Sequence, residues 1–259
     1  MSLWRICLSR LSRRLVLTRR LPPRFGVRRL RVSPGAALAY FHPLTEARWR
    51  DLFDFAWHGV GPGECVWDIG ANLGVFAFAA AHRAGPTGEV LAIEPDPWLA
   101  DLMRQSAQQT APLAAPVHIL SCAVSDGIGV ESFSTPSLAR SGSHLTAVAG
   151  AGKALVGETA ALNPVITVHL DWLLERRRKP DAIKIDVEGA ELAVLQGARI
   201  LLRNHRPRLL IEVYERSADA ITALLHEEGY ALFDFSSGWP GSPVTRAVYQ
   251  TLALPRHTP

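Results

Sequence analysis

A glycine-containing turn is the first feature of this chain that could do chemistry. An apolar run ends with Asp68, and Gly70, Asn72 and Gly74 follow before an apolar, helix-forming segment. Strand, glycine turn and helix is how α/β enzymes present backbone N–H groups to an anionic or polar cofactor, although such a turn also occurs without a ligand. Asn72 replaces the second glycine of the dinucleotide fingerprint, and its side chain would crowd a pyrophosphate. Asp68 would repel a diphosphate but could accept hydrogen bonds from an ammonium group, such as that of S-adenosylmethionine.

A second acid, Glu94, stands 24 positions after Gly70. In a βαβ unit, an acid about 20 residues after the turn meets a ribose diol, because a carboxylate has two acceptor oxygens. Pro95 and Pro97 remove backbone donors, which ends the strand and keeps the acid at its tip. We therefore predict that Glu94 binds a ribose; the alternative is a solvated acid at a strand end.

A third group of charged residues lies at the end of another predicted strand. Asp186 and Glu188 follow Ile183–Ile185 directly, and active sites of open α/β sheets lie outside the carboxyl ends of strands. These two acids are therefore placed for catalysis. Glu191 stands in the first turn of the next helix, where the helix dipole favours a capping role. Lys184 alternates with isoleucines, as a charge on one strand face or a partner for an acid.

The motifs need a sheet that brings strand ends to one edge. Alternating strands and helices predict a parallel sheet. Residues 134–164 lack periodicity and are rich in small polar residues, as in a lid over an acceptor or a linker-like surface loop. Strands are predicted at 65–69, 88–93, 117–122, 165–169, 181–186, 208–213, 230–235 and 246–253, and helices at 45–58, with a Thr cap, 75–84, 97–110, 170–178 and 217–228.

Five motifs together carry a family resemblance. They are D-I-G-A-N-L-G from Asp68, I-E-P-D-P around Glu94, A-V-S-D at 123–126, L-D-W-L-L from Leu170 and K-I-D-V-E-G-A-E from Lys184. Together they resemble the FkbM family of S-adenosylmethionine-dependent methyltransferases, over about residues 65–235. The resemblance implies a class I methyltransferase fold, an α/β, Rossmann-like, seven-stranded, mostly parallel sheet with helices on both faces. It also implies methyl transfer to a hydroxyl oxygen of a sugar, polyketide or related natural product.

The resemblance also implies roles for individual positions. Four residues of the glycine turn would line the methionine end of the cofactor, one acid would hold the ribose, a turn would lie near the adenine, and two acids would face the transferring methyl. The residues at the methionine end are Asp68, Gly70, Asn72 and Gly74, and the ribose acid is Glu94. The turn near the adenine is 123–126, with Ser125 and Asp126 as its binding residues, and the acids at the methyl are Asp186 and Glu188.

The implied reaction needs help at the acceptor, because a hydroxyl is a poor nucleophile until a base or metal draws off its proton. Candidates for the base are Asp186, Glu188 and His144; a lone loop histidine is, however, more often plain surface. Asp186 and Glu212 end neighbouring predicted strands and could share Mg²⁺, which prefers hard oxygen ligands. Metal use is left open.

Composition agrees with one domain. The 259 residues are 48% hydrophobic and 20% charged, as in globular proteins, and no run approaches the ~18 apolar residues of a membrane span. Three cysteines without metal-ligand spacing indicate reduced thiols and a cytoplasmic setting. The abundance of Ala, Arg, Gly and Pro favours a bacterial source.

Charge is concentrated in residues 1–31, which we predict to be an arm preceding the domain at 32–259. The arm holds ten of the 28 basic residues and no acid, which leaves 18 basic against 24 acidic side chains, a net charge of −6, in the remainder. A nucleic-acid partner for the whole chain therefore loses support. Leu3, Cys7, Leu11 and Leu15 recur as in an amphipathic helix able to lie on anionic lipid, such as that of the inner membrane surface. The alternatives are a helix packed on the domain, a frayed end or a mitochondrial presequence.

Two other classes of function were weighed. An NAD-dependent oxidoreductase would need a glycine at position 72 and a catalytic Tyr/Lys or His set, and Tyr214 with Lys184 forms no recognisable pair. A membrane-associated nucleotide-binding module without catalysis would have lost the acids at its strand tips, which are present. A methyltransferase acting on a small-molecule, glycan or lipid-linked acceptor is the prediction, and the sequence does not identify the acceptor.

Overall fold

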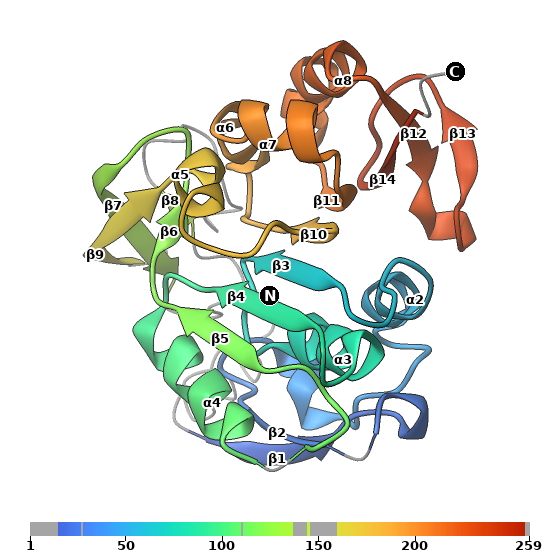
Figure 1. The fold of residues 1–259 in the computed structure, drawn as a ribbon. Coiled ribbons are helices and arrows are strands. Elements are labelled where there is room, and N and C mark those ends of the chain that lie inside the picture. Colours follow the sequence, from blue (N-terminus) through green and yellow to red (C-terminus); the bar gives the residue numbers. More distant parts are fainter. Residues whose placement is uncertain (1–14, 27, 110, 137–143, 146–159, 257–259) are drawn as a thin grey trace, which may run out of the picture.

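A central mixed sheet organises the molecule. The computed structural model describes residues 15–26, 28–109, 111–136, 144–145 and 160–256, and within them eight strands form this sheet (Figure 1). In order across the sheet they are β13 (Ser242–Val244), β12 (Tyr230–Asp234), β14 (Gln250–Pro255), β11 (Arg208–Glu212), β10 (Ala182–Ile185), β3 (Cys65–Ile69), β4 (Glu89–Ile93) and β5 (Val117–Leu120). Strands β5 to β11 pair in parallel, and β14 runs antiparallel between β11 and β12.

This arrangement confirms the predicted α/β fold with its mostly parallel sheet. Seven of the strands are those expected from the sequence, and the short β13 pairs antiparallel with β12 inside a segment that was predicted to be mostly loop. Strand β3 lies between β4 and β10, so the chain leaves it in one direction and later returns on its other side. The carboxyl ends of β3 and β10 therefore form the topological switch point, where open α/β sheets bind ligands.

Helices cover both faces of the sheet, because alternate strand residues feed two separate cores. On β3, Val66 packs with one core and Trp67 with the other. Figure 1 shows one group of helices on either side. The first face carries α2 (Arg50–His58), α3 (Val75–Ala84) and α4 (Pro97–Ala107); the second carries α5 (Leu170–Leu174), α6 (Glu191–Gln196), α7 (Arg199–His205) and α8 (Ala218–Glu227).

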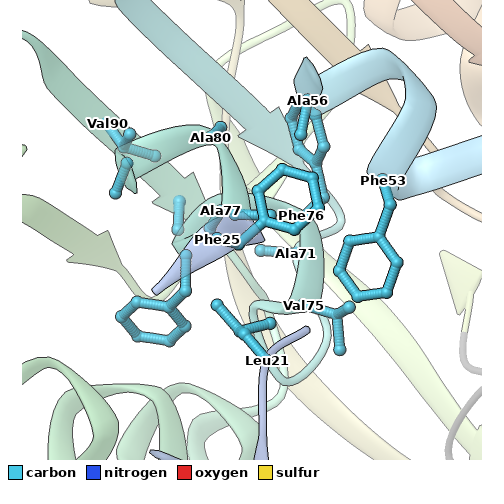
Figure 2. Close-up of a cluster of buried hydrophobic side chains, with 14 of the residues drawn as sticks. Leu21, Phe25, Phe53, Ala56, Ala71, Val75, Phe76, Ala77, Ala80 and Val90 are labelled. Carbon is cyan, nitrogen blue, oxygen red and sulfur yellow. The ribbon is translucent and has the colours of Figure 1, made fainter. Parts of the chain in front are cut away.

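Helix α3, which follows the glycine turn, is enclosed by its neighbours. All its residues from Val75 to Ala81 are buried, several of them alanines that let neighbouring elements approach closely. The aromatic rings of Phe25 and Phe53 stack beside it with centroids 5.0 Å apart (Figure 2). This packing fixes the start of the helix, and with it the turn that precedes it.

The predicted boundary after residue 31 differs from the structure. Strands β1 (Leu17–Arg20) and β2 (Arg29–Val32) form an antiparallel hairpin, with the 3-10 helix η1 (Pro23–Phe25) between them. Leu21 and Leu30 are buried in the core around α3, because apolar residues alternate with the arginines that dominate the composition. Part of the predicted arm thus belongs to the domain, and the predicted amphipathic helix lies almost wholly outside the described residues.

Part of the predicted lid is also regular structure. Strands β7 (Gly129–Pro136), β8 (His144–Leu145) and β9 (Ala160–Val168) form a second sheet with β6 (Ala123–Val124). Both ends of the segment 134–164 are therefore paired, because β7 and β9 run antiparallel from Gly129↔Thr167 to Pro136↔Ala160. The rest of this segment lies outside the described residues, except β8.

The start of helix α2 differs from the prediction. The predicted Thr cap is wrong, since α2 begins at Arg50 after Trp49, and the Thr45 carbonyl instead accepts turn hydrogen bonds from Arg48 and Trp49. Among the described residues, no helix has the length and apolar character needed to cross a bilayer.

Candidate active site

The glycine turn brings the end of β3 into close contact with β10. Gly70 has a φ of +74°, and a Cβ placed there would stand 1.9 Å from the Asp186 carbonyl oxygen. The Gly70 and Ala71 N–H groups both donate to the Ile93 carbonyl at 3.0 Å. Gly74, with a φ of +78°, caps the start of α3 in the left-handed region. A glycine is therefore required at position 70 because the Asp186 carbonyl lies so close, and glycine is favoured at position 74 because the backbone there is left-handed.

Asn72 is suited to this turn. Its φ of 52° is in the left-handed region, which Asn tolerates better than most residues with a side chain. Its N–H donates to Glu94 Oε2 at 2.8 Å. Its side-chain Oδ1 is buried without a hydrogen-bond partner among the described residues. A buried acceptor without a partner is costly, so Asn72 offers a binding group to a ligand.

Glu94 lies at the tip of β4, as predicted, and is almost fully buried. One oxygen accepts the Asn72 N–H, and the other accepts the Asp96 N–H at 2.9 Å. Burial raises the pKa of Glu94 to about 8, against the effect of these two donors. Each oxygen keeps a further lone pair, so the carboxylate can still accept from a diol.

Lys184 is a buried cation beneath the turn. Its Nζ donates to the Gly70 carbonyl at 2.9 Å and lies 3.4 Å from carboxylate oxygens of both Asp68 and Asp186. Burial alone would lower the pKa of Lys184, but the two acids raise it above its ordinary value. Lys184 was predicted to be either a charge on one strand face or a partner for an acid, and in the structure it pairs with two acids.

Asp68 is fully buried beside Lys184, and neither of its oxygens has a hydrogen-bond partner within the described chain. Burial raises its pKa, and the Lys184 charge opposes that shift. The residue does not line the cavity described next. The register Lys184↔Asp68 turns both side chains to one face of the sheet, so Asp68 lies beneath the turn beside Lys184.

A cavity of about 210 Å³ opens at the switch point, over the carboxyl ends of β3, β4 and β10. Gly70, Asn72, Glu94, Asp186 and Glu188 all line it, so five of the predicted site residues meet there. Its other lining residues are mostly apolar or aromatic: Ala37, Tyr40, Trp49, Leu52, Ile69, Ala71, Val75, Phe76, Ile93, Pro95, Leu99, Cys122, Ala123, Val124, Phe133, Leu145, Val187 and Ala190, with Lys184 as the cation.

Tyr40 is a site residue that the sequence did not reveal. It lies in η2 (Leu38–Phe41), and its ring stacks on Trp49 with centroids 5.0 Å apart. Burial raises its pKa, and the charges of Asp68, Asp186 and Glu94 raise it further. Its hydroxyl is therefore neutral and can only bind as a hydrogen-bonding group. An isolated aromatic residue before the first sheet strand carries no local signal for such a role.

Glu188 is held in a specific orientation in the loop after β10. Its φ of 55° is left-handed, which costs energy for a residue with a side chain. Glu191 supports this loop, since its Oε1 accepts the Gly189 N–H at 2.8 Å and the Val187 N–H at 3.3 Å. Glu191 was predicted to cap a helix, and here its carboxylate caps the loop.

The Glu188 carboxylate has one partner from a distant strand. Tyr214, just after β11, donates its hydroxyl to Glu188 Oε2 at 2.6 Å. Burial raises the pKa of Glu188 to about 7, and this hydrogen bond opposes the shift. At neutral pH the group is therefore divided between its acidic and basic forms, as a proton-transfer group should be.

Glu212 ends β11 at the same edge of the sheet. Tyr249 donates its hydroxyl to Glu212 Oε1. Burial first, then the charges of Asp186 and Glu188, raise the pKa of Glu212 to about 8. Within the part of the chain that the structure describes, no three or more His, Cys, Asp or Glu side chains form a group that could hold a metal ion. Shared Mg²⁺ binding by Asp186 and Glu212 thus stays a prediction.

Comparisons with known proteins decide the family. The family model described as the methyltransferase FkbM domain matches residues 68–232. This chain belongs to the FkbM methyltransferase family. A relative, the 31-O-demethyl-FK506 methyltransferase FkbM of Streptomyces tacrolimicus, is 30% identical over 241 residues, which span 80% of this chain and 90% of that protein. The hexuronic acid methyltransferase AglP of Haloferax volcanii is 29% identical over 136 residues, 52% of this chain and only 49% of that protein's length.

Solved structures give a weaker comparison. An FkbM methyltransferase from Methylobacillus flagellatus KT has a TM-score of 0.49 and 18% identity, over 76% of this chain and 49% of that one. The fold of this FkbM protein is therefore argued from its own strand order.

The residues around the cavity fit S-adenosylmethionine. Asn72 Oδ1 offers an acceptor without a partner, Gly70 leaves no room for a side chain, and Glu94 keeps lone pairs for a diol. The acids Asp186 and Glu188 in the lining suit a ligand that carries positive charge.

Four predicted cofactor residues do not line the cavity: Asp68, Gly74, Ser125 and Asp126. Ser125 is buried with its N–H on the Val168 carbonyl at 3.0 Å, and its Oγ donates to Asp126 at 3.3 Å. Asp126 itself is exposed. The short β6 turns the chain toward the second sheet, so Cys122, Ala123 and Val124 line the cavity in their place. The predicted turn thus reaches the cavity through Ala123 and Val124, and the contact of Ser125 and Asp126 with an adenine stays a prediction.

His144, the third candidate base, is described only by its backbone. It lies in β8 opposite Ser134, and its side chain falls outside the described part of the structure. The neighbouring Leu145 lines the cavity, so β8 reaches the site.

Proposed function

We propose that this FkbM protein transfers the methyl group of S-adenosylmethionine to a hydroxyl oxygen of a sugar, polyketide or lipid-linked natural product. The observation that carries the proposal is the position of Glu188. It lies in the cavity with Glu94 and the glycine turn, fixed in a left-handed loop and hydrogen-bonded through one carboxylate oxygen. That arrangement suits a general base held for an acceptor that binds next to the cofactor.

Glu188 has the properties of the proton acceptor. Its Oε2 is held by Tyr214, which leaves Oε1 for the acceptor hydroxyl. S-adenosylmethionine, when bound, supplies a methyl group on a sulfonium centre that a nucleophile displaces in line. The acceptor oxygen forms the new bond to the methyl carbon as the carbon–sulfur bond breaks, and Glu188 takes the hydroxyl proton. Holding both reactants in one cavity can contribute roughly 7–11 kcal/mol to such a step.

Asp186 and Lys184 act as a fixed electrostatic unit next to the base. The Asp186 side chain is about one third exposed (32%) and ion-paired with Lys184 at 3.4 Å. It can accept a hydrogen bond from the acceptor or from the cofactor's ammonium group, and the Lys184 ammonium lies beside it. The two carboxylates Asp186 and Glu188 thus have different roles because only one has a cation beside it.

The acceptor wall is apolar and aromatic. Tyr40, Trp49, Phe133 and Leu145 line the cavity, and none of them belongs to a strand of the central sheet. Such a wall can bury a ring face, as a sugar or polyketide acceptor would present. The named substrates of the two relatives above, a hexuronic acid and 31-O-demethyl-FK506, support these two acceptor classes, although the first relative matches over only half its length.

The test begins with calorimetric titration of purified protein with S-adenosylmethionine, S-adenosylhomocysteine and NAD. We expect binding of both adenosyl compounds and none of NAD, with affinity weakened at least about tenfold in E94A, because hydrogen bonds to the ribose are lost. E94Q is the matched control, since it retains the size and one acceptor oxygen. No binding of either adenosyl compound, or no effect of E94A, would overturn the cofactor assignment; binding of NAD instead would favour an oxidoreductase.

The bond formed is tested with labelled methyl groups and a panel of sugars and macrolides. A methyl ether survives mild base, whereas a methyl ester on a carboxylate is hydrolysed. Base-stable product that disappears in E188Q, with unchanged S-adenosylhomocysteine affinity, supports hydroxyl methylation with Glu188 as base. Base-labile product would shift the acceptor to a carboxylate. Activity after EDTA treatment, with and without Mg²⁺, tests the predicted metal.

A further inference from the structure

The β1–β2 hairpin presents basic residues on its outer face. Its register pairs Thr18 with Arg31 and Arg20 with Arg29. Side chains alternate along each strand, and Leu30 and Val32 point into the core. The opposite face therefore carries Thr18, Arg20, Arg29 and Arg31, here named the arginine face; the first three are exposed and Arg31 is half-buried.

Other arginines of the same segment have structural partners. Arg19 donates to the carbonyls of Phe41 and His42, at 2.7 and 3.1 Å. Arg24 forms ion pairs with two acids of the domain, and Arg28 donates to carbonyls at the end of α4. These residues hold the hairpin in place, so the arginine face is a preformed surface.

The charges of the arginine face lack the carbonyl and carboxylate partners that Arg19, Arg24 and Arg28 have among the described residues. Among the described residues, Arg20 and Arg29 have no carboxylate partner, and the Arg31 guanidinium donates to the Thr18 hydroxyl at 3.3 Å. Like charges directly opposite each other on paired strands are destabilising. An anion bound on that face would therefore reduce the repulsion between the charges of Arg20 and Arg29.

We propose that the arginine face docks the protein on a membrane that contains anionic lipid. The preceding segment argues for lipid: residues 1–14 hold four arginines and no acid, interleaved with Trp, Ile and several Leu residues. A mixture of arginine and large apolar side chains suits a bilayer surface, whereas nucleic acid would need only the charge. Leu15, where the described chain begins, is 41% exposed and continues this mixture to the edge of the hairpin.

The docked face is connected to the cavity. The Arg19 bonds join β1 to the backbone of η2, and Tyr40 of η2 lines the cavity. Arg31 N–H donates to Ser106 Oγ at 2.8 Å, which joins β2 to α4. The arginine face and one wall of the cavity therefore belong to one rigid unit, and membrane docking fixes the orientation of that wall.

The experiment is flotation of the full-length protein with vesicles of phosphatidylcholine alone or mixed with phosphatidylglycerol, at low and high salt. We expect binding only to the anionic vesicles, weakened by salt because exposed charges are screened. The double variant R20Q/R29Q should lose about thirtyfold in apparent affinity, from about 1 kcal/mol for each charge near an anionic surface. R177Q/K179Q is the control, since it removes two exposed basic residues far along the chain.

Three outcomes would overturn the proposal. One is equal loss in the two double variants, which would mean that only net charge matters. Another is undiminished binding by R20Q/R29Q together with complete loss on deletion of residues 1–14, which would move the binding to that segment. The third is tighter binding to an oligonucleotide duplex than to the anionic vesicles. Thermal unfolding of each variant is the control that the hairpin remains folded. Cofactor titration is a separate measurement, and its result does not depend on which of the three outcomes is observed.

Discussion

Tyr214 donates its hydroxyl to Glu188 Oε2 at 2.6 Å, and this bond joins the end of β11 to the loop after β10. The Tyr214 ring packs edge-on against Tyr249, whose own hydroxyl donates to Glu212. Two tyrosine–glutamate pairs thus stand side by side at the carboxyl edge of the sheet. Only the first pair reaches the cavity, because Glu188 lines it and Glu212 does not.

Replacing Tyr214 with Phe should change the pH dependence of methyl transfer. The hydroxyl stabilises the ionised Glu188 carboxylate, so its loss raises the pKa of Glu188 above about 7. A base must be ionised to act, and the acidic limb of the kcat profile should therefore move up by about one pH unit. Y249F is the control and should not move the limb upward. An unchanged limb in Y214F would show that the hydrogen bond does not set the protonation of Glu188.

The buried carboxyl of Glu94 should make the ligand-free protein less stable as pH rises. Its folded pKa is raised to about 8, above an unfolded value near 4.5, so the folded state binds the proton more tightly. Its stabilising contribution is present below the unfolded pKa and is lost as pH rises toward about 8. Thermal unfolding across that window should show a falling Tm that E94Q flattens. The exposed E175Q should follow the wild type, and an identical slope in E94Q would contradict the assignment.

Removing the cation beneath the turn should destabilise the fold. Lys184→Met leaves Asp68 and Asp186 without the charge that lies 3.4 Å from each. Loss of one partner from a buried ion pair costs about 3–5 kcal/mol. The double variant D68N/K184M should recover part of this loss, since the deepest carboxylate is then neutral. Denaturant unfolding measures the effect, and a loss below about 1 kcal/mol would mean that Lys184 is not the counterion of the site.

Gly70→Ala should damage both stability and cofactor affinity. The added Cβ would stand 1.9 Å from the Asp186 carbonyl oxygen, at a φ of +74°. Strain at such a backbone costs about 1–3 kcal/mol, and the displaced carbonyl adds to it. G127A is a matched control, because a Cβ there meets nothing within 4 Å. We expect G127A to unfold within about 0.5 kcal/mol of the wild type; equal behaviour of the two variants would mean that the turn adapts.

Seven of the eight strands of the sheet, and the motifs at their tips, follow from local patterns in the sequence. The glycine turn, Glu94, Asp186 and Glu188 could be placed because local periodicity shows each strand, and parallel strands in an alternating α/β chain meet at one edge. Strand periodicity and the motifs at strand ends depend only on residues that are close together in the chain. The A-V-S-D motif contributes Ala123 and Val124 to the cavity lining, but its sequence does not show that β6 joins the second sheet.

The residues that complete the site from distant parts of the chain are visible only in the folded protein. Tyr40 and Tyr214 reach the cavity region from opposite ends of the chain, and neither has a local pattern that announces it. The same holds for the hairpin at 17–32, whose arginine-rich composition suggested a separate arm while its alternating apolar residues joined the core. A contact between residues far apart in sequence depends on how whole elements pack, and no pattern within one element records it.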